Sequence, residues 1–119
     1  MKPRILVVED EPRTAMSLKE LLEDWGFEVS PPVASGEAAV EKARAERPDV
    51  ILMDIKLSGE MDGIEAAGRI ISEFGIPVIF MSASSDPETM KRAKAVKPAG
   101  YILKPIDFTE LLKKINAAL

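Results

Sequence analysis

The chain has 119 residues, of which 46% are hydrophobic and 30% are charged, and it contains neither cysteine nor histidine. This balance is typical of a single globular domain, and the length is sufficient for a hydrophobic core without a disulfide or a structural metal. The missing residue types exclude thiol nucleophiles, Ser-His-Asp catalysis and zinc held by Cys or His. The net charge of -4 disfavours direct binding to nucleic acid.

No apolar run in the sequence approaches the length that spans a membrane, and acidic residues interrupt the first run after Val8. We therefore expect a cytoplasmic protein without a membrane partner. Any chemistry must depend on carboxylates, hydroxyls and lysines.

The first half of the chain contains two expected strands and two expected helices. Residues 4–8 are apolar and rich in β-branched side chains, as in a strand covered on both faces. A one-sided apolar stripe between Pro12 and Gly26 predicts a helix. Residues 27–30 alternate apolar and polar before two prolines, which indicates an edge strand. Ser35 can then begin a second helix that runs to about Arg47.

The second half repeats the same alternation three times. Its apolar runs, 50–53, 78–81 and 101–103, predict three further strands. Each is followed by an amphipathic segment with its own N-terminal signal. These signals are Asp62 with Glu65, Asp86 before Pro87, and Asp107 with Glu110.

Five strand-helix units predict an α/β fold, because right-handed crossovers place such strands in a parallel sheet with helices on both faces. Five strands are too few for an eight-stranded barrel, so we expect an open, doubly wound sheet. Its expected order is 2-1-3-4-5, the common flavodoxin-like (βα)5 arrangement. One domain over residues 1–119 is expected, with its ligand site at the carboxyl ends of the strands.

Polar side chains follow four of the five expected strands, at tips that this order makes adjacent. Neighbouring carboxylates about 4 Å apart repel by roughly 4 kcal/mol at an effective dielectric constant near 20, so the acids among them need a cation. With no His or Cys, an all-oxygen site favours Mg²⁺ or Mn²⁺. The polar residues are Glu9, Asp10, Glu11, Asp54, Ser82 and Lys104.

Each of these residues also has a simpler interpretation. Acids before a helix often cap it, an aspartate can merely end a buried strand, and a loop serine or lysine is commonly solvated. Their combination is more specific. A carboxylate flanked by a divalent cation and an ammonium group, with a hydroxyl donor nearby, is suited to attack a phosphoryl group.

The sequence resembles the receiver domain of two-component response regulators over essentially the whole chain. The matching stretches are Ile5–Pro12, Asp54, Met61–Gly63, Met81–Ala83 and Lys104–Pro105. The resemblance implies a signalling switch that catalyses only its own phosphorylation and dephosphorylation. A sensor histidine kinase or a histidine phosphotransfer protein would be its donor.

The resemblance also implies a role for each acidic residue of the site. Asp54 would be the phosphoacceptor and a metal ligand. Asp10 would bind Mg²⁺ directly, and Glu9 would support the ion, commonly through water. The backbone carbonyl of Lys56 would be a further ligand.

Three further roles concern the phosphorylated state. Ser82 would donate to a phosphoryl oxygen, and Lys104 would pair with Asp54 and then with its phosphate. The Lys104-Pro105 bond would be cis. Tyr101 matches an aromatic switch whose ring turns inward as Ser82 moves, although an amphipathic strand residue with a solvated hydroxyl is an equally simple interpretation. The fourth helix, fifth strand and fifth helix would form the readout face.

The sequence does not identify the partner that the readout face binds. The face could bind a downstream protein, an output domain outside this sequence, or a second copy in a phosphorylation-dependent dimer. Basic residues on the last two helices predict a solvated face, with an acidic partner as the alternative. They are Lys91, Arg92, Lys94, Lys97, Lys113 and Lys114.

Two departures from the family pattern lie near the site. Glu9 replaces a more usual aspartate, and the loop between Asp54 and Gly63 is one residue longer than usual, with Ser58 where proline is frequent. Two other functions remain as alternatives. An aspartate-nucleophile phosphohydrolase would carry a second aspartate where Lys56 stands, and a pseudo-receiver would bind partners without accepting phosphate.

Overall fold

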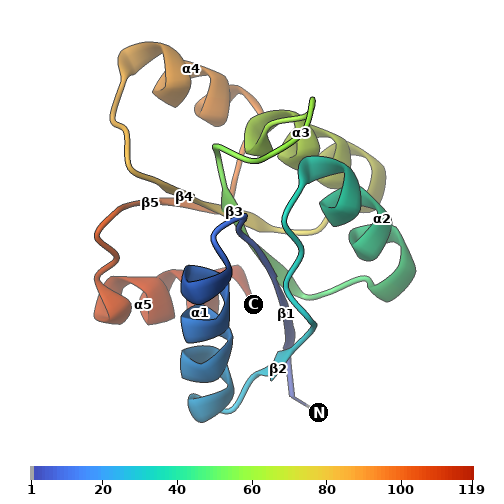
Figure 1. The fold of residues 1–119 in the computed structure, drawn as a ribbon, viewed down its shortest axis with the longest axis vertical. Coiled ribbons are helices and arrows are strands. Elements are labelled where there is room, and N and C mark those ends of the chain that lie inside the picture. Colours follow the sequence, from blue (N-terminus) through green and yellow to red (C-terminus); the bar gives the residue numbers. More distant parts are fainter. Residues whose placement is uncertain (1) are drawn as a thin grey trace.

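The computed structural model describes residues 2–119, so Met1, at which the expected domain begins, lies outside the described residues. Strands and helices alternate along the chain, and the strands form one parallel sheet of order β2-β1-β3-β4-β5 (Figure 1), which confirms the predicted fold. The elements are β1 Arg4–Val8, α1 Pro12–Asp24, β2 Glu28–Val29, α2 Gly36–Glu46, β3 Val50–Asp54, α3 Gly63–Phe74, β4 Val78–Ser82, α4 Pro87–Ala95, β5 Gly100–Leu103 and α5 Phe108–Ala118.

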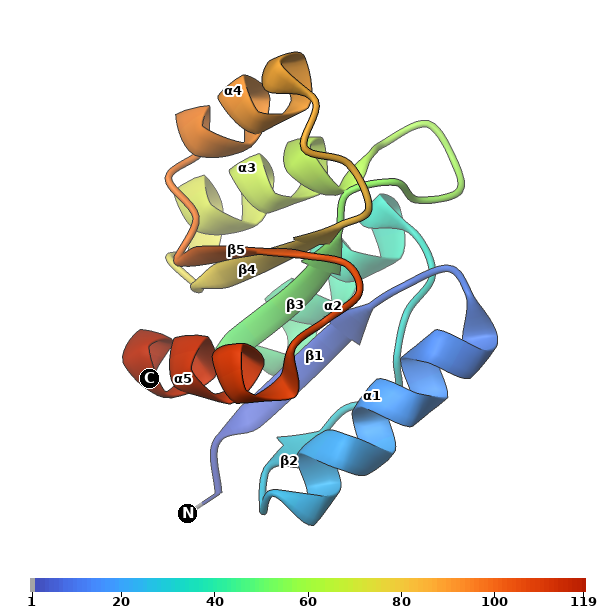
Figure 2. The same cartoon turned by 90° about the vertical axis from the view of Figure 1, so that its left-hand side faces the viewer.

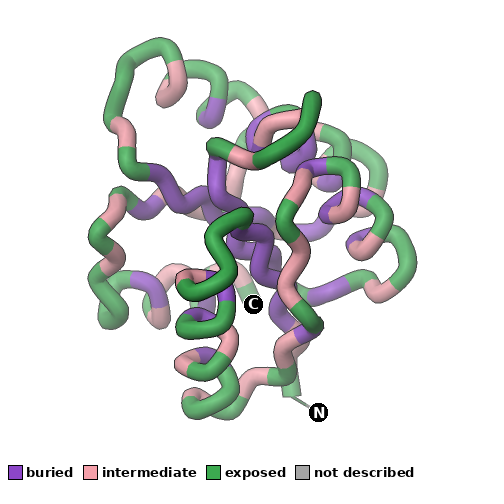
Figure 3. The backbone as a smooth tube through the Cα atoms, viewed as in Figure 1, coloured by how far each residue is buried: buried purple, intermediate pink, exposed green. Residues whose placement is uncertain are grey.

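The sheet separates two hydrophobic cores. Helices α2, α3 and α4 cover one face, and α1 and α5 cover the other (Figures 1 and 2). Successive side chains of a strand point to opposite faces, so Leu6 and Val8 enter the first core while Ile5 and Val7 enter the second. The central strands are buried throughout (Figure 3), which explains why their sequences are continuously apolar.

The helices begin where the sequence predicts, because side chains there accept bonds from free backbone N–H groups. Ser35, Asp62 and Asp107 each accept from a residue of the first turn of α2, α3 and α5. Asp86 does the same for α4. None of the helices within residues 2–119 is long and apolar enough to cross a membrane.

Some boundaries differ from the expected ones. The edge strand β2 covers Glu28–Val29 rather than 27–30, since its register with β1 pairs only these two residues before the prolines. Helix α1 ends at Asp24, and Trp25 caps it before Gly26, which adopts a positive φ of 95°. Strand β3 extends to Asp54, so the expected phosphoacceptor is itself the last residue of a buried strand.

Candidate functional site

The carboxyl ends of β1, β3, β4 and β5 lie side by side along one edge of the sheet. The register pairs Val8 with Met53, and Ser82 with Leu103, so the residues that follow these strands come together. A cavity of about 350 Å³ opens at this edge. Its walls include six predicted site residues, which are Glu9, Asp10, Asp54, Lys56, Ser82 and Lys104.

Three carboxylates form a compact group in this cavity. Glu9, Asp10 and Asp54 each offer an oxygen, and these oxygens lie within 4.8 Å of one another. The exposed fractions of Glu9 and Asp54 are only 3% and 7%, whereas Asp10 is exposed. A set of carboxylate oxygens, open to solvent on one side, fits a hard divalent cation such as Mg²⁺ or Mn²⁺.

Lys104 joins the two buried carboxylates. Its Nζ lies 3.1 Å from Glu9 Oε1 and 3.3 Å from Asp54 Oδ2. The backbone N–H of Lys104 donates to the Ser82 carbonyl at 2.8 Å, which fixes its position beside β4. Burial alone would lower the pKa of Lys104, but the two carboxylates outweigh it and raise the pKa, so the group stays charged. The bond to Pro105 is cis, as expected.

The site holds more negative than positive charge. Burial raises the pKa of Glu9 above its ordinary value, and the nearby Asp54 carboxylate raises it further. The backbone N–H of Glu11 donates to Glu9 Oε2 at 3.2 Å and partly offsets this. Within the described residues, Lys104 is the only ammonium group that bonds the three carboxylates. A bound divalent cation would add positive charge beside them.

The third acid after β1 has a different role. The Glu11 carboxylate accepts bonds from the backbone N–H groups of Arg13 and Thr14 and from the Thr14 hydroxyl. These bonds, the Thr14 N–H first, lower the pKa of Glu11. Glu11 is therefore the N-cap of α1, and the acidic group consists of the other two acids together with Asp54.

Ser82 and Tyr101 meet at one backbone carbonyl. The Ser82 hydroxyl donates to the Ser84 carbonyl at 3.2 Å and accepts from the Ser84 N–H at 3.1 Å. The Tyr101 hydroxyl donates to the same carbonyl at 3.0 Å, and its half-buried ring packs edge-on against Phe80. Tyr101 thus lies outside the acidic cavity but shares a hydrogen-bond acceptor with a residue of its wall.

Two contacts of the site are absent from the predictions made from the sequence. The Glu9–Lys104 pair joins residues 95 positions apart, and the Ser58 hydroxyl donates to Asp10 Oδ2 at 3.2 Å across 48 positions. Strand order predicts which tips are neighbours, but it does not predict which atoms bond. No local sequence signal marks either contact.

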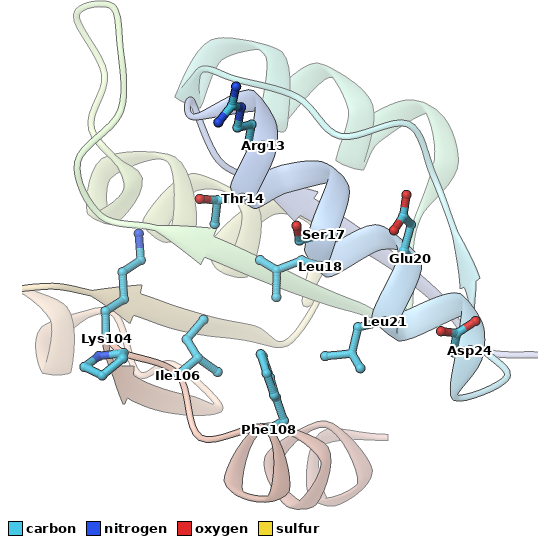
Figure 4. Close-up of a pocket in the computed structure, with 11 residues that line it drawn as sticks. Arg13, Thr14, Ser17, Leu18, Glu20, Leu21, Asp24, Lys104, Ile106 and Phe108 are labelled. Atoms are coloured by element: carbon cyan, nitrogen blue, oxygen red, sulfur yellow. The ribbon is translucent and has the colours of Figure 1, made fainter.

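A second cavity adjoins the first. It has a volume of about 610 Å³, lies between α1 and the start of α5, and shares Thr14 and Lys104 with the acidic cavity. Figure 4 shows Leu21 of α1 and Phe108 of α5 on its facing walls. Phe108 is 53% exposed, so its ring forms part of the open surface of this cavity.

Comparison with known sequences identifies the family. The profile of the response regulator receiver domain matches residues 5–116. The chain therefore belongs to the receiver domain family of two-component response regulators, as the resemblance implied.

Named relatives support the same assignment. The transcriptional regulatory protein PdtaR of Mycobacterium tuberculosis is 34% identical over 98% of this chain and 56% of its own length. The DNA-binding response regulator MtrA of Mycolicibacterium smegmatis is 31% identical over 100% of this chain and 51% of its own length. The chain thus spans about half the length of such relatives.

Solved structures with the same fold cover nearly the whole chain. The signal receiver domain of a modulated diguanylate cyclase from Desulfovibrio desulfuricans G20 is 41% identical, with a TM-score of 0.93 over 99% of this chain and 94% of that one. The chemotaxis protein CheY4 of Vibrio cholerae is 29% identical, with a TM-score of 0.88 over the full length of both chains.

Proposed function

We propose that Asp54 accepts a phosphoryl group from the phosphohistidine of a sensor histidine kinase or a histidine phosphotransfer protein. The observation that carries this proposal is the position of the Asp54 carboxylate. It is 7% exposed, bonded to Lys104, and grouped with two other carboxylates at an open sheet edge. Carboxylates about 4 Å apart repel by roughly 4 kcal/mol at intermediate dielectric, so such a group is costly unless it binds a cation.

In the proposed reaction an Asp54 oxygen attacks phosphorus and forms an acyl phosphate. The bond from phosphorus to the donor nitrogen breaks, and the imidazole nitrogen keeps the electron pair and takes up a proton. Lys104 already contacts Asp54 and Glu9, so its ammonium group is positioned to bind the incoming phosphoryl oxygens.

Glu9, Asp10, Asp54 and the Lys56 backbone carbonyl would hold Mg²⁺ or Mn²⁺. When bound, the ion supplies positive charge beside the phosphoryl oxygens.

The proposed conformational switch depends on the oxygens that phosphorylation adds to Asp54. A phosphoryl group adds strong hydrogen-bond acceptors where a carboxylate stood, and the Ser82 hydroxyl can exchange the Ser84 carbonyl for one of them. Tyr101 bonds the same carbonyl, so the exchange alters the surroundings of its side chain on β5. Because Ser82 and Lys104 bind the two states differently, phosphorylation shifts the balance between conformations of the α4-β5-α5 face.

The proposal also covers the domain as a whole, its location and its partners. Residues 1–119 form one receiver domain in the cytoplasm, which modifies only itself and turns over no separate substrate. The cavity between α1 and α5 offers the protein donor a surface of mixed apolar and charged side chains, and it includes Lys104, which contacts Asp54. The α4-β5-α5 face passes the signal to a downstream protein or output domain, or to a second copy, without direct contact to nucleic acid.

The decisive test is incubation of the purified chain with acetyl phosphate, with Mg²⁺ or with EDTA. We expect one phosphoryl group per chain with Mg²⁺ and almost none with EDTA. Asp54→Asn should abolish the modification, whereas Asp24→Asn, an exposed aspartate at the far end of α1, should leave it intact.

The alternatives give different results in the same assay. A pseudo-receiver would take up no phosphate, and a phosphohydrolase would release phosphate continuously from several monoesters. Either result would contradict the proposed function.

A further inference from the structure

Ser58 connects the loop between β3 and α3 to the acidic group. Its hydroxyl donates to Asp10 Oδ2 at 3.2 Å, and both residues are exposed. Asp10 is also the only exposed member of the three-carboxylate group. Among the three, its carboxylate is therefore the one that solvent leaves most free to rotate.

The backbone that carries Ser58 is held in place by the start of α2. Ser58 pairs with Ser35 through an isolated parallel bridge. The next residue, Gly59, has a φ of 95°, and a Cβ there would lie 2.9 Å from a Glu37 carboxylate oxygen. Further along the loop, a Cβ on Gly36 of α2 would lie 2.7 Å from the Met61 carbonyl. This packing does not involve the Ser58 hydroxyl.

We propose that Ser58 is a positioning residue for the divalent cation site, acting through Asp10. The inference rests on the proposed function. Its hydroxyl bonds one oxygen of the Asp10 carboxylate and restrains the plane of the group, so that the other oxygen would be free to bind the cation. The folded loop then already restricts the rotation of the Asp10 side chain, so less conformational freedom is lost when the cation binds.

The expected effect is a change in cation affinity. Loss of a hydrogen-bond partner behind a metal ligand commonly weakens metal binding 10- to 100-fold. Because Ser58 and Asp10 are exposed, we expect the lower end, about tenfold. Ser58→Thr keeps the hydroxyl and should restore the affinity of the natural sequence.

The experiment is a titration of the unphosphorylated chain with Mn²⁺, in which electron paramagnetic resonance reports the free ion. Four proteins are compared: the natural sequence, Ser58→Ala, Ser58→Thr and Ser72→Ala. Ser72 is a matched control, since it is exposed and its hydroxyl donates only to the Arg69 carbonyl on α3. Unfolding temperatures in EDTA should be alike for all four, because the loop packing remains.

We expect the Kd for Mn²⁺ to be about tenfold higher in Ser58→Ala than in the natural sequence. The Kd values of Ser58→Thr and Ser72→Ala should equal that of the natural sequence. Equal affinity of Ser58→Ala and the natural sequence would overturn the inference and leave the proposed function standing. Failure of Ser58→Thr to restore affinity would also overturn it, since the hydroxyl would then not be responsible. Failure of the natural sequence to bind Mn²⁺ would contradict the inference and the proposed function together.

Discussion

The two ends of β1 carry clusters of charged side chains that differ in how their charges are balanced. At the amino end, the Arg4 guanidinium lies 2.7 Å from a Glu28 carboxylate oxygen and 3.9 Å from one of Glu46. The Glu28 carboxylate raises the pKa of Arg4, and the Ser30 hydroxyl lowers the pKa of Glu46. Both shifts, of Arg4 and of Glu46, favour the charged form.

At the carboxyl end the pattern is different. Burial raises the pKa of Glu9, and one lysine bonds two of three grouped carboxylates. The charges of the amino end are largely satisfied by one another near solvent and contribute little to stability. At the carboxyl end the single ammonium group of Lys104 faces three carboxylates, and in the proposed function a divalent cation would supply the remaining positive charge. A charge cluster thus points to function when its own members do not neutralise one another.

The largest contrast between the two ends of β1 should come from replacing the basic side chain at the centre of each charge cluster. Lys104→Met should slow phosphorylation by acetyl phosphate about 100-fold, because it removes a donor to the charge that develops on the phosphoryl oxygens. Arg4→Met should leave the rate almost unchanged. Rapid-quench measurement of phosphoprotein formation compares the two variants directly. Equal rates for both would mean that Lys104 has only a structural role.

The two ends of α3 provide a second contrast, since the helix begins at the carboxyl edge and ends at the amino edge. A Cβ on Gly63 would lie 2.0 Å from the Asp54 carbonyl oxygen, so Gly63→Ala must displace the backbone of the site. We expect a loss of about 3 kcal/mol in the free energy of unfolding. Gly75 has open space but a φ of 67°, so Gly75→Ala should cost only about 1 kcal/mol.

Denaturant unfolding of both glycine variants measures this difference. A Gly63→Ala protein as stable as Gly75→Ala would show that the backbone around Asp54 yields easily. The close approach of α3 to the end of β3 would then not be needed to hold the site.

The smallest expected effect is a pH dependence at the amino end. The pKa of Glu46 is lower in the folded chain than its ordinary value of 4.5, so its charged form favours folding. That contribution is present above the unfolded value and is lost as the pH falls through the folded value. Glu46→Gln should therefore reduce the free energy of unfolding by less than about 1 kcal/mol at neutral pH and by less still in acid.

Urea unfolding at a series of pH values checks the sign. Glu20→Gln, which changes an exposed glutamate of α1, serves as the control and should differ little from the natural sequence. If the loss of stability caused by Glu46→Gln became larger as the pH falls, the lowered pKa of Glu46 would be contradicted.

The fold and the residues at the strand tips could be predicted because both depend on periodicity and strand order, whereas Lys56 and Tyr101 entered only through the resemblance to the family. Asp54 and Lys104 each follow an apolar run, and parallel strands bring such positions to one edge. The bond of Ser58 to Asp10 and the cavity beside Phe108 could not be predicted in this way. They depend on the path of a loop and on the gap between two helices, which hydrophobic pattern does not encode.

The most direct test of the central claim is to locate the phosphoryl group. After reaction with acetyl phosphate and Mg²⁺, reduction with borohydride converts an acyl phosphate of aspartate into homoserine, which peptide mass spectrometry assigns to a position. We expect homoserine at position 54 and at no other acid of the chain. Homoserine in place of another aspartate such as Asp10, or no homoserine in a chain that has taken up phosphate, would contradict it.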